Sequence, residues 1–346
     1  MLLSMRVAMY YNNRDVRIED MPVPGISPDE LLVKVLASGI CGSDVMEWYR
    51  VKKAPLVLGH EITGEIVKTG ERVQNYHNGQ RVFVSHHVPC NTCRYCLSGN
   101  HTACETLHTT NFDPGGFAQY IRVPPLNVDR GVFILPDEIS FDEGTLIEPL
   151  ACVIRGQRVA RLKPGQSMLV LGSGISGLLH IALARSIGAG RIIATDINEY
   201  RLGAAKKFGA DAVIDARGDV PGRVIQSNEG RGVDLVIVCT GSLSAFNQAL
   251  LSVDRGGTVL FFAPTEPGVS LSVPLNELWR NGTKLLPSYG GSPADIAAAV
   301  ELIKYGRVPV KEMITHRLSL DQAPLGFRIV AEASESIKVI LKPHQG

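Results

Sequence analysis

The first 130 residues of the chain carry short apolar or alternating runs that glycine, proline and asparagine interrupt. The clearest runs span Leu31–Leu36, Ile62–Val67, Val82–Val84 and Ala118–Val123. Runs of this length, bounded by turn residues, are typical of β-strands. The pattern therefore predicts a β-rich domain in this part of the chain.

The pattern changes near Phe141, where apolar residues recur at helical spacing up to a turn at Pro164 and Gly165. From Ser167 onward, strand-like runs such as MLVLG, RIIATD and VDLVIVCTG alternate with helix-like segments such as ISGLLHIALARSIGA. This alternation predicts a parallel sheet covered by helices on both faces. We therefore expect a second domain of the α/β class.

A helix over Asp295–Lys304 and a final strand over Ile337–Leu341 follow the α/β region. We expect this tail to return to the first domain. The expected boundaries are residues 1–150 with 290–346 for the first domain, and residues 151–289 for the second. A chain of 346 residues is also long for a single hydrophobic core, which favours two domains.

Composition limits the classes of partner. A hydrophobic content of 45% is typical of a globular protein, and a net charge of +1 gives no electrostatic reason to bind nucleic acid or an anionic membrane. The chain has no run of roughly 18 apolar residues, and its opening lacks the apolar core of a secretion signal. We expect a cytoplasmic protein that binds neither nucleic acid nor membranes.

Four cysteines with the spacing C-x₂-C-x₂-C-x₇-C are the strongest local signal: Cys90, Cys93, Cys96 and Cys104. Four thiolates this close along the chain can surround one zinc ion tetrahedrally. Such a closed shell leaves no position for substrate, so the predicted zinc is structural. The alternative, two disulfides in a secreted protein, is disfavoured by the missing signal peptide and the odd total of seven cysteines.

A G-x-G-x-x-G motif follows the strand-like run MLVL and opens a helix; its residues are Gly172, Ser173, Gly174, Ile175, Ser176 and Gly177. In this context the motif is typical of a dinucleotide site, where the helix N-terminus binds a pyrophosphate. Asp196 ends the next strand, and a carboxylate there accepts ribose hydroxyls and repels a 2′-phosphate. NAD is therefore the predicted cofactor, although Arg201 is close enough along the chain to approach a 2′-phosphate.

A third set of residues offers one thiol, one imidazole and two carboxylates: Cys41 in GICGSD, His60 and Glu61 in GHE, and Glu148 in IEPLAC. Each has an ordinary explanation alone, as a buried thiol, a core histidine or a helix-entry acid. Together they predict an open zinc site.

These motifs, in this order and spacing, resemble the zinc-dependent medium-chain dehydrogenase/reductase superfamily, the alcohol dehydrogenases in the broad sense. The resemblance covers essentially the whole chain. It implies a GroES-like β-barrel carrying two zinc ions, followed by a Rossmann domain. GHE, IEPLAC, VSHHVPCNTCRYC and ITHRLSL are most similar to the sorbitol or L-iditol 2-dehydrogenases, with L-threonine 3-dehydrogenases the nearest rivals.

The resemblance implies that Cys41 and His60 bind the catalytic zinc and that Glu61 or Glu148 completes the protein shell. One thiolate, one neutral imidazole and one carboxylate bring Zn²⁺ to net zero, whereas a second carboxylate weakens it as a Lewis acid. We therefore expect that the two glutamates do not both bind tightly in the reactive state. Asp44 resembles the carboxylate that holds His60, and Ser43 the hydroxyl that takes the alcohol proton.

The sequence departs from the polyol branch at two places. Relatives usually carry a histidine five residues after the zinc cysteine, where this chain has Met46, so proton exit needs another route. Sorbitol dehydrogenases place Arg-Tyr where this chain has Ser288-Tyr289, which removes a strong donor for a polyhydroxylated substrate. His87 matches a histidine of threonine dehydrogenases that lies near the substrate, and it is equally well explained as a polar neighbour of the cysteine lobe.

Alternatives therefore stay open. The reaction expected is oxidation of a secondary alcohol or polyol by NAD, with L-threonine or a simple alcohol such as 2,3-butanediol as alternative substrates. A non-enzyme alternative is an NAD-binding sensor with a structural zinc. The resemblance also implies a homo-oligomer, dimer or tetramer, formed by edge-to-edge pairing of Rossmann sheets.

Overall fold

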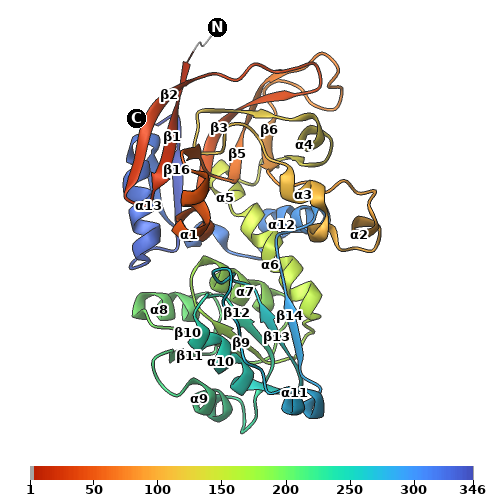
Figure 1. The fold of residues 1–346 in the computed structure, drawn as a ribbon, viewed down its shortest axis with the longest axis vertical. Coiled ribbons are helices and arrows are strands. Elements are labelled where there is room, and N and C mark those ends of the chain that lie inside the picture. The colour runs from red at the N-terminus through yellow and green to blue at the C-terminus, as the bar shows by residue number, and fades with distance from the viewer. Residues whose placement is uncertain (1–3, 346) are drawn as a thin grey trace. The chain divides into compact units, whose positions relative to one another are not determined.

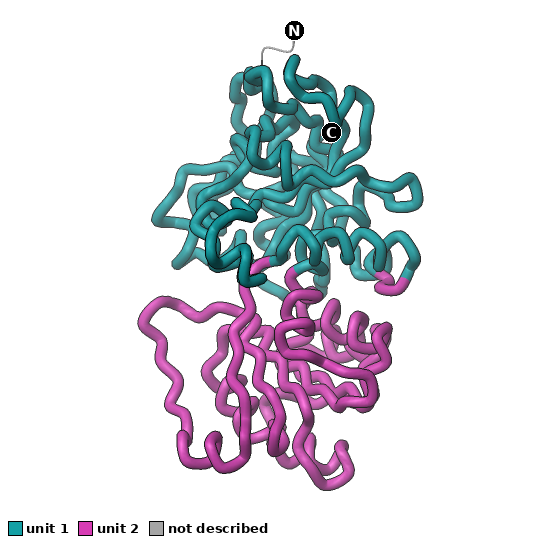
Figure 2. Tube along the Cα trace, turned by 90° about the vertical axis from the view of Figure 1, so that its right-hand side faces the viewer, with its two compact units in different colours: residues 1–151, 291–306, 310–346 teal, residues 152–290, 307–309 magenta. Residues whose placement is uncertain are grey.

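The computed structural model describes residues 4–345, which divide into two compact units. Unit 1 comprises residues 1–151, 291–306 and 310–346, and unit 2 comprises residues 152–290 and 307–309 (Figure 2). Unit 1 thus contains both ends of the chain, and unit 2 is a nearly continuous central segment.

Unit 1 is built on two sheets (Figure 1). The smaller sheet has the order β2-β1-β4, and its strands are β1 (Ser4–Asn12), β2 (Asp15–Pro22) and β4 (Leu56–Val57). The larger sheet has the order β15-β16-β3-β5-β6-β8, with β7 also paired to β3. Its strands are β3 (Leu31–Ile40), β5 (Glu61–Thr69), β6 (Arg81–Ser85), β7 (Tyr120–Val123), β8 (Val132–Ile134), β15 (Ile314–Ser319) and β16 (Lys338–Lys342).

The helices of unit 1 are mostly short and connect these strands. They are α1 (Glu47–Arg50), α2 (Arg94–Leu97), α3 (Glu105–Thr109), α4 (Pro125–Arg130), α5 (Phe141–Gly144), α12 (Pro293–Lys304) and α13 (Ala323–Glu332). Helix α6 (Ile147–Ala160) begins in unit 1 and ends in unit 2.

The four apolar runs predicted as strands lie in β3, β5, β6 and β7 of the larger sheet. Strands β3, β5 and β6 extend beyond the predicted runs. Strand β7 is shorter, because it begins at Tyr120 and Ala118 makes only an isolated bridge with Val7. The helical pattern after Phe141 also divides into two helices, α5 and α6. Pro149 has no backbone N–H to donate within a continuous helix, whereas the first turn of α6 tolerates it.

The tail of the chain enters the larger sheet through β16, which pairs antiparallel with β3. In this register Val339 lies opposite Ile40, and Ile340 lies opposite Gly39. Strand β3 pairs on its other side with β5, where Gly39 lies opposite Glu61. Three strands from distant parts of the chain therefore meet around Gly39.

Unit 2 is a Rossmann fold. Its sheet has the order β11-β10-β9-β12-β13-β14, and every pair of neighbouring strands is parallel. The strands are β9 (Met168–Leu171), β10 (Ile192–Asp196), β11 (Ala212–Asp215), β12 (Val233–Val238), β13 (Val253–Phe261) and β14 (Lys284–Pro287). The helices are α7 (Ile175–Ser186), α8 (Glu199–Lys207), α9 (Val220–Ser227), α10 (Leu243–Ser252) and α11 (Leu275–Asn281). The predicted fold class is confirmed.

The core of unit 2 explains the near-continuous apolar runs in its strands. All four residues of β9 and all five of β10 are buried. A strand covered on both faces has no polar side, so its sequence does not alternate. The carboxyl ends of these parallel strands share one edge of the sheet, which is where open α/β folds bind their ligands.

Candidate active site and metal centres

Strand pairing in unit 1 brings Cys41, His60 and Glu61 together. Cys41 directly follows β3, whereas His60 and Glu61 stand at the start of β5. Because these strands are antiparallel and Gly39 lies opposite Glu61, the end of one strand meets the start of the other. One ligand atom from each of the three residues lies within 4.8 Å of the others.

The three residues offer a sulfur, a ring nitrogen and a carboxylate oxygen, which is a donor set that Zn²⁺ accepts. Three protein ligands leave one position of a tetrahedron for a substrate or water. Glu148, the other glutamate considered from the sequence, lies in the first turn of α6 and is outside this group of three.

A short 3₁₀ turn, η1 (Gly42–Val45), holds Ser43 and Asp44 beside Cys41. Asp44 is fully buried and accepts a hydrogen bond from the Cys41 amide at 3.0 Å. Its other oxygen lies 3.4 Å from Nδ1 of His60. This contact restrains the imidazole of His60.

This contact also shifts the ionisation of both groups. Burial opposes charge on His60, but the charges of Asp44 and Cys41 prevail and raise the pKa of His60 well above its usual value. Burial likewise opposes charge on Asp44, but the charges of His60 and Arg50 lower the pKa of that carboxyl.

Glu61 has a second partner that the sequence did not reveal. Lys338 of β16 donates from Nζ to Oε2 of Glu61 and also to the carbonyl of Ile40, the latter at 3.2 Å. Both side chains of the ion pair are at most 1% exposed. A Cβ on Gly39 would lie 2.2 Å from Oε2 of Glu61 and 2.7 Å from Cε of Lys338, so only glycine leaves room for the pair.

His86 and His87, which follow β6, are further neighbours of His60. The ring centroid of His86 lies 4.9 Å from that of His60 and 3.8 Å from that of His87. Nδ1 of His86 is buried and has no hydrogen-bond partner among residues 4–345. The sequence analysis named His87 but missed His86. The histidine doublet after a strand paired with β5 was the available signal, since Ser85 lies opposite Glu61.

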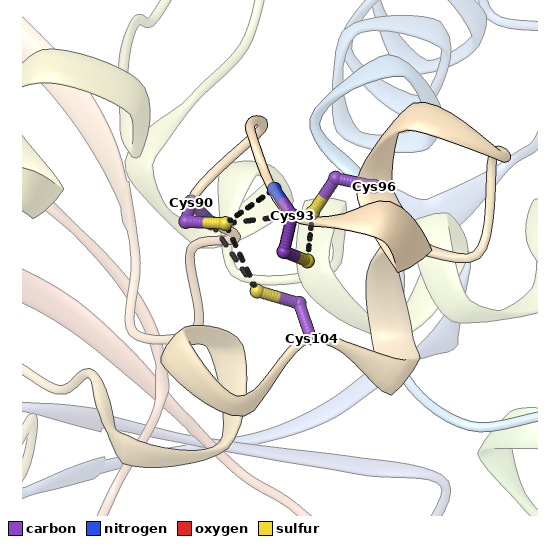
Figure 3. Close-up of side chains that lie close together, drawn as sticks. All are labelled: Cys90, Cys93, Cys96 and Cys104. Atoms are coloured by element: carbon purple, nitrogen blue, oxygen red, sulfur yellow. Dashed lines mark hydrogen bonds between the residues drawn. The ribbon is translucent and has the colours of Figure 1, made fainter.

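Cys90, Cys93, Cys96 and Cys104 lie close together in the segment of unit 1 that contains α2 and α3, the cysteine lobe (Figure 3). Their sulfur atoms are close: 3.6 Å from Cys90 to Cys104, 3.6 Å from Cys93 to Cys96 and 4.0 Å from Cys90 to Cys96. Such separations fit four sulfurs around one Zn²⁺ at about 2.3 Å each.

Backbone amides around the lobe point at the sulfur atoms. The amides of Thr92 and Cys93 donate to Sγ of Cys90 at 3.4 and 3.2 Å, and the Cys90 amide donates to Sγ of Cys104 at 3.4 Å. Hydrogen bonds from Thr92 and Cys93 lower the pKa of Cys90 to about 5. These donors stabilise thiolate, the form in which cysteine binds a metal.

The glycine motif of unit 2 forms the turn between β9 and α7. Gly172 has a φ of +95°, and a Cβ on Gly177 would lie 2.0 Å from the Gly172 carbonyl oxygen. Asp196 ends β10, and its carboxylate accepts from the amides of Ser173 at 2.8 Å and Asn198 at 2.9 Å. A Cβ on Gly174 would lie 3.9 Å from Nη1 of Arg201, the nearest atom, so the turn is open above Gly174.

Unit 2 also has a pocket of about 330 Å³ at the carboxyl ends of β13 and β14. Its lining includes Phe261, Phe262 and Ser288. Oγ of Ser288 is buried and has no hydrogen-bond partner among the described residues. The pocket therefore offers a polar group to a ligand at the edge of the sheet where such folds bind them.

Within residues 4–345, no helix combines the length and apolar character needed to cross a bilayer.

Comparisons with known proteins agree with this architecture. Residues 27–132 match the model of the alcohol dehydrogenase GroES-like domain, and residues 176–305 match that of the zinc-binding dehydrogenases. Sorbitol dehydrogenase of Bacillus subtilis is 34% identical over 99% of this chain and 98% of its own length.

Two solved structures share the fold. The crystal structure of 2R,3R-butanediol dehydrogenase from Bacillus subtilis is 28% identical with a TM-score of 0.86, and the match covers 98% of this chain and all of that one. A structure from Sinorhizobium meliloti 1021 bound to NADP is 29% identical with a TM-score of 0.87, covering 98% and 99% of the two chains.

The chain thus belongs to the zinc-dependent medium-chain dehydrogenase/reductase superfamily and, within it, is sorbitol dehydrogenase-like. It is an oxidoreductase of the alcohol dehydrogenase class that uses a nicotinamide cofactor.

Proposed function

We propose that this protein is an NAD-dependent zinc dehydrogenase that oxidises a secondary alcohol of a polyol, of the sorbitol or L-iditol kind, to a ketone. The observation that carries the proposal is the convergence of Cys41, His60 and Glu61 beside Ser43 and Asp44. The similarity to sorbitol dehydrogenase over nearly the whole chain supports the substrate class.

The donor set of the three residues fits a catalytic zinc, and the four-cysteine lobe fits a structural one, giving two zinc ions per subunit. When bound, zinc supplies a Lewis acid for the substrate hydroxyl, and the nicotinamide accepts the hydride. Asp44 holds Nδ1 of His60, which leaves Nε2 for the metal. Oγ of Ser43 would take the hydroxyl proton of the substrate while passing its own hydroxyl proton on to water.

Of the two candidate glutamates, Glu61 is favoured as the third ligand because it belongs to the group of three. Lys338 offsets the charge of Glu61 in the absence of a metal. A cation so close to the carboxylate also keeps the ligand set from neutralising Zn²⁺ completely, which favours loss of the substrate proton. Glu148 is not needed as a simultaneous ligand.

NAD is preferred over NADP because the Asp196 carboxylate stands at the end of β10, beside the glycine turn. A 2′-phosphate placed there meets a negative charge, whereas ribose hydroxyls find an acceptor. The proposed cofactor-binding residues are Gly172, Gly174, Ile175, Ser176, Gly177, Asp196 and Arg201.

The proposed assembly is a homo-oligomer in which the β14 edges of two Rossmann sheets meet. Strand β14 is the end strand of its sheet, so one side of its backbone has no neighbouring strand. Leu275 and Trp279 of α11 are 72% and 81% exposed, and a second copy would cover such side chains. A reducing cytoplasm is the proposed compartment, because it maintains the thiolates that zinc binding needs.

The test is NAD⁺ reduction followed by absorbance, with sorbitol, L-iditol, L-threonine, 2,3-butanediol and 2-propanol in parallel. Each reaction is run with and without a zinc chelator. Chelator-sensitive oxidation of a polyol supports the proposal, whereas oxidation of L-threonine alone moves the enzyme to the rival branch and gives His87 a role. No oxidation of any alcohol by zinc-loaded, NAD-binding protein overturns it.

A further inference from the structure

Arg50, at the end of α1, reaches back over the η1 turn to the residues that support the metal ligands. Its Nε donates to the Ser43 carbonyl at 2.9 Å, and its Nη2 donates to Oγ of Ser43 at 3.1 Å. The same Nη2 lies 3.5 Å from Oδ1 of Asp44. The Arg50 side chain is only 15% exposed, so these contacts are largely shielded from water.

The two hydrogen bonds from Arg50 restrict the orientation of the Ser43 hydroxyl as well as the position of the residue. Because Oγ accepts a hydrogen bond from Arg50, the hydroxyl hydrogen must point elsewhere, and one lone pair stays available. The planar guanidinium holds the backbone and the side chain of Ser43 at once, which limits the rotation of the hydroxyl. A hydroxyl held in this way is oriented before the substrate arrives.

Arg50 also acts on the other side of the turn. Oδ1 of Asp44 faces both Nη2 of Arg50 and Nδ1 of His60, at 3.5 and 3.4 Å. A fully buried carboxylate between two such partners is held more firmly than by His60 alone. One cation therefore contacts both Ser43, the proposed proton acceptor, and Asp44, the support of a metal ligand.

We propose that Arg50 is the positioning residue of this site, which orients the Ser43 hydroxyl for the substrate and steadies Asp44 behind His60. It acts through a permanent charge, because a guanidinium does not give up its proton at physiological pH. Arg50 therefore orients Ser43 without carrying the proton, and because Met46 offers no titratable group either, Ser43 passes its proton to water. This inference rests on the proposed dehydrogenase function.

A purely structural role is the competing explanation, since the guanidinium carbon of Arg50 also lies 4.7 Å from the ring centroid of Tyr49. Lys53 provides a matched control. Its Nζ lies 5.0 Å from the same ring, and no contact between Lys53 and Ser43 or Asp44 is present among the described side chains. Loss of the contact with Tyr49 is thus separable from loss of the contacts with Ser43 and Asp44.

The experiment compares Arg50→Gln, Arg50→Lys and Lys53→Gln with the wild type, all loaded with zinc. Two quantities are measured: kcat and KM for oxidation of the best alcohol, and the half-time of zinc transfer to a chelating dye. The melting temperature of each variant establishes that it is folded. Arg50→Lys serves as the second variant if Arg50→Gln does not fold.

We expect Arg50→Gln to lower kcat by about tenfold to hundredfold, the effect of losing a charged hydrogen bond, with little change in the KM for NAD. Zinc transfer is expected to be several times faster. Arg50→Lys retains the positive charge but not the paired donors of the guanidinium, so its kcat is expected to lie between those of the wild type and Arg50→Gln. Lys53→Gln is expected to match the wild type in both measurements.

Wild-type kcat and wild-type zinc transfer in Arg50→Gln would overturn the inference while leaving the dehydrogenase function intact. Equal losses of kcat in Arg50→Gln and Lys53→Gln would also overturn it, because the contact with Tyr49 would then explain the effect. If the wild type oxidises no alcohol, the proposed function fails and zinc transfer alone decides: faster transfer supports the role of Arg50, and equal transfer overturns it.

Discussion

Lys338 and Glu61 form a buried ion pair although 277 residues separate them in the sequence. The pair exists because β16 and β5 flank β3, and because Gly39 of β3 has no side chain to fill the space between them. Its acidic member also belongs to the group of three candidate zinc ligands. The last strand of the chain thus supplies a counter-charge to the candidate active site.

Replacing the lysine tests this relationship. Lys338→Met leaves the Glu61 carboxylate buried without its cation, which we expect to destabilise the zinc-free protein by about 3–5 kcal/mol. Zinc provides another positive charge for Glu61, so it should stabilise the variant more than the wild type. Thermal unfolding with and without zinc measures both effects.

Lys342→Met is the control, because Lys342 lies on the same strand and its partner Asp142 keeps a second cation, Arg317. Equal destabilisation of the two zinc-free variants would argue against a special role for the buried pair.

The four-cysteine lobe is expected to bind a structural zinc ion, which takes no direct part in the reaction. Cys96→Ser should reduce the zinc content by one ion per subunit and increase protease cleavage within residues 90–110, because the lobe has only a small apolar cluster of its own. Elemental analysis and limited proteolysis measure these changes. Cys239→Ser is the matched control, because burial raises the pKa of Cys239 and so disfavours its thiolate, and this residue belongs to neither group of candidate ligands. A full zinc content in Cys96→Ser would contradict the assignment.

Asp196 is predicted to select the cofactor. Asp196→Asn removes the negative charge near the ribose, and we expect the ratio of kcat/KM for NAD to that for NADP to decrease about tenfold to hundredfold. Arg201 remains nearby to attract the 2′-phosphate. Adding Arg201→Ala should abolish the gain with NADP. Steady-state kinetics with both cofactors provide the ratio, and an unchanged ratio in Asp196→Asn would show that another residue selects the cofactor.

The parts of the protein that the sequence predicted well depend on neighbours along the chain. The four cysteines are close in sequence, and the glycine turn follows its strand directly. Sequence spacing was therefore enough to predict the cysteine cluster and the turn between strand and helix. The α/β unit was predictable for a related reason: strands covered on both faces are apolar throughout, and the helices between them have a different period.

The parts that were missed depend on tertiary pairing. Lys338 resembles an ordinary surface lysine in sequence, and only the register of β16 on β3 brings it to Glu61. Arg50 likewise ends a helix of four residues, with nothing local to indicate that its side chain turns back to Ser43. Strand register and side-chain direction over such distances are not encoded in any local pattern.

His180 makes the stability of unit 2 depend on pH. It is fully buried, its ring packs edge-on against Phe262, and burial lowers its pKa to about 3. Between about pH 3 and the ordinary value of 6.5, the unfolded chain binds a proton that the folded protein does not. The free energy of unfolding therefore decreases as the pH is lowered below 6.5, by up to about 1.4 kcal/mol per pH unit.

His180→Gln removes this titration, so its free energy of unfolding should depend less steeply on pH between 6.5 and 5 than that of the wild type. The exposed His77 provides the control substitution, His77→Gln. Urea unfolding at several pH values measures the slope. Identical slopes in the wild type and His180→Gln would mean that His180 has the same pKa in the folded and unfolded states, which would contradict the prediction.

Substitutions of two glycines in the same turn should distinguish effects on folding stability from effects on cofactor binding. A methyl group on Gly177 meets the Gly172 carbonyl oxygen at 2.0 Å, so Gly177→Ala should force α7 away from the turn and destabilise unit 2 by about 1–3 kcal/mol. A methyl group on Gly174 meets nothing closer than 3.9 Å, and the backbone there has an ordinary φ of −69°. Gly174→Ala should therefore keep the wild-type melting temperature.

The same methyl group on Gly174 stands at the N-terminus of α7, where the pyrophosphate of the cofactor must approach the backbone. We expect Gly174→Ala to raise the Kd for NAD by about tenfold or more, as one displaced charge-assisted hydrogen bond would. Fluorescence titration with NAD and thermal unfolding, run on both variants, provide the comparison. A stable Gly174→Ala that binds NAD like the wild type would place the pyrophosphate elsewhere, because no stability effect would mask the result.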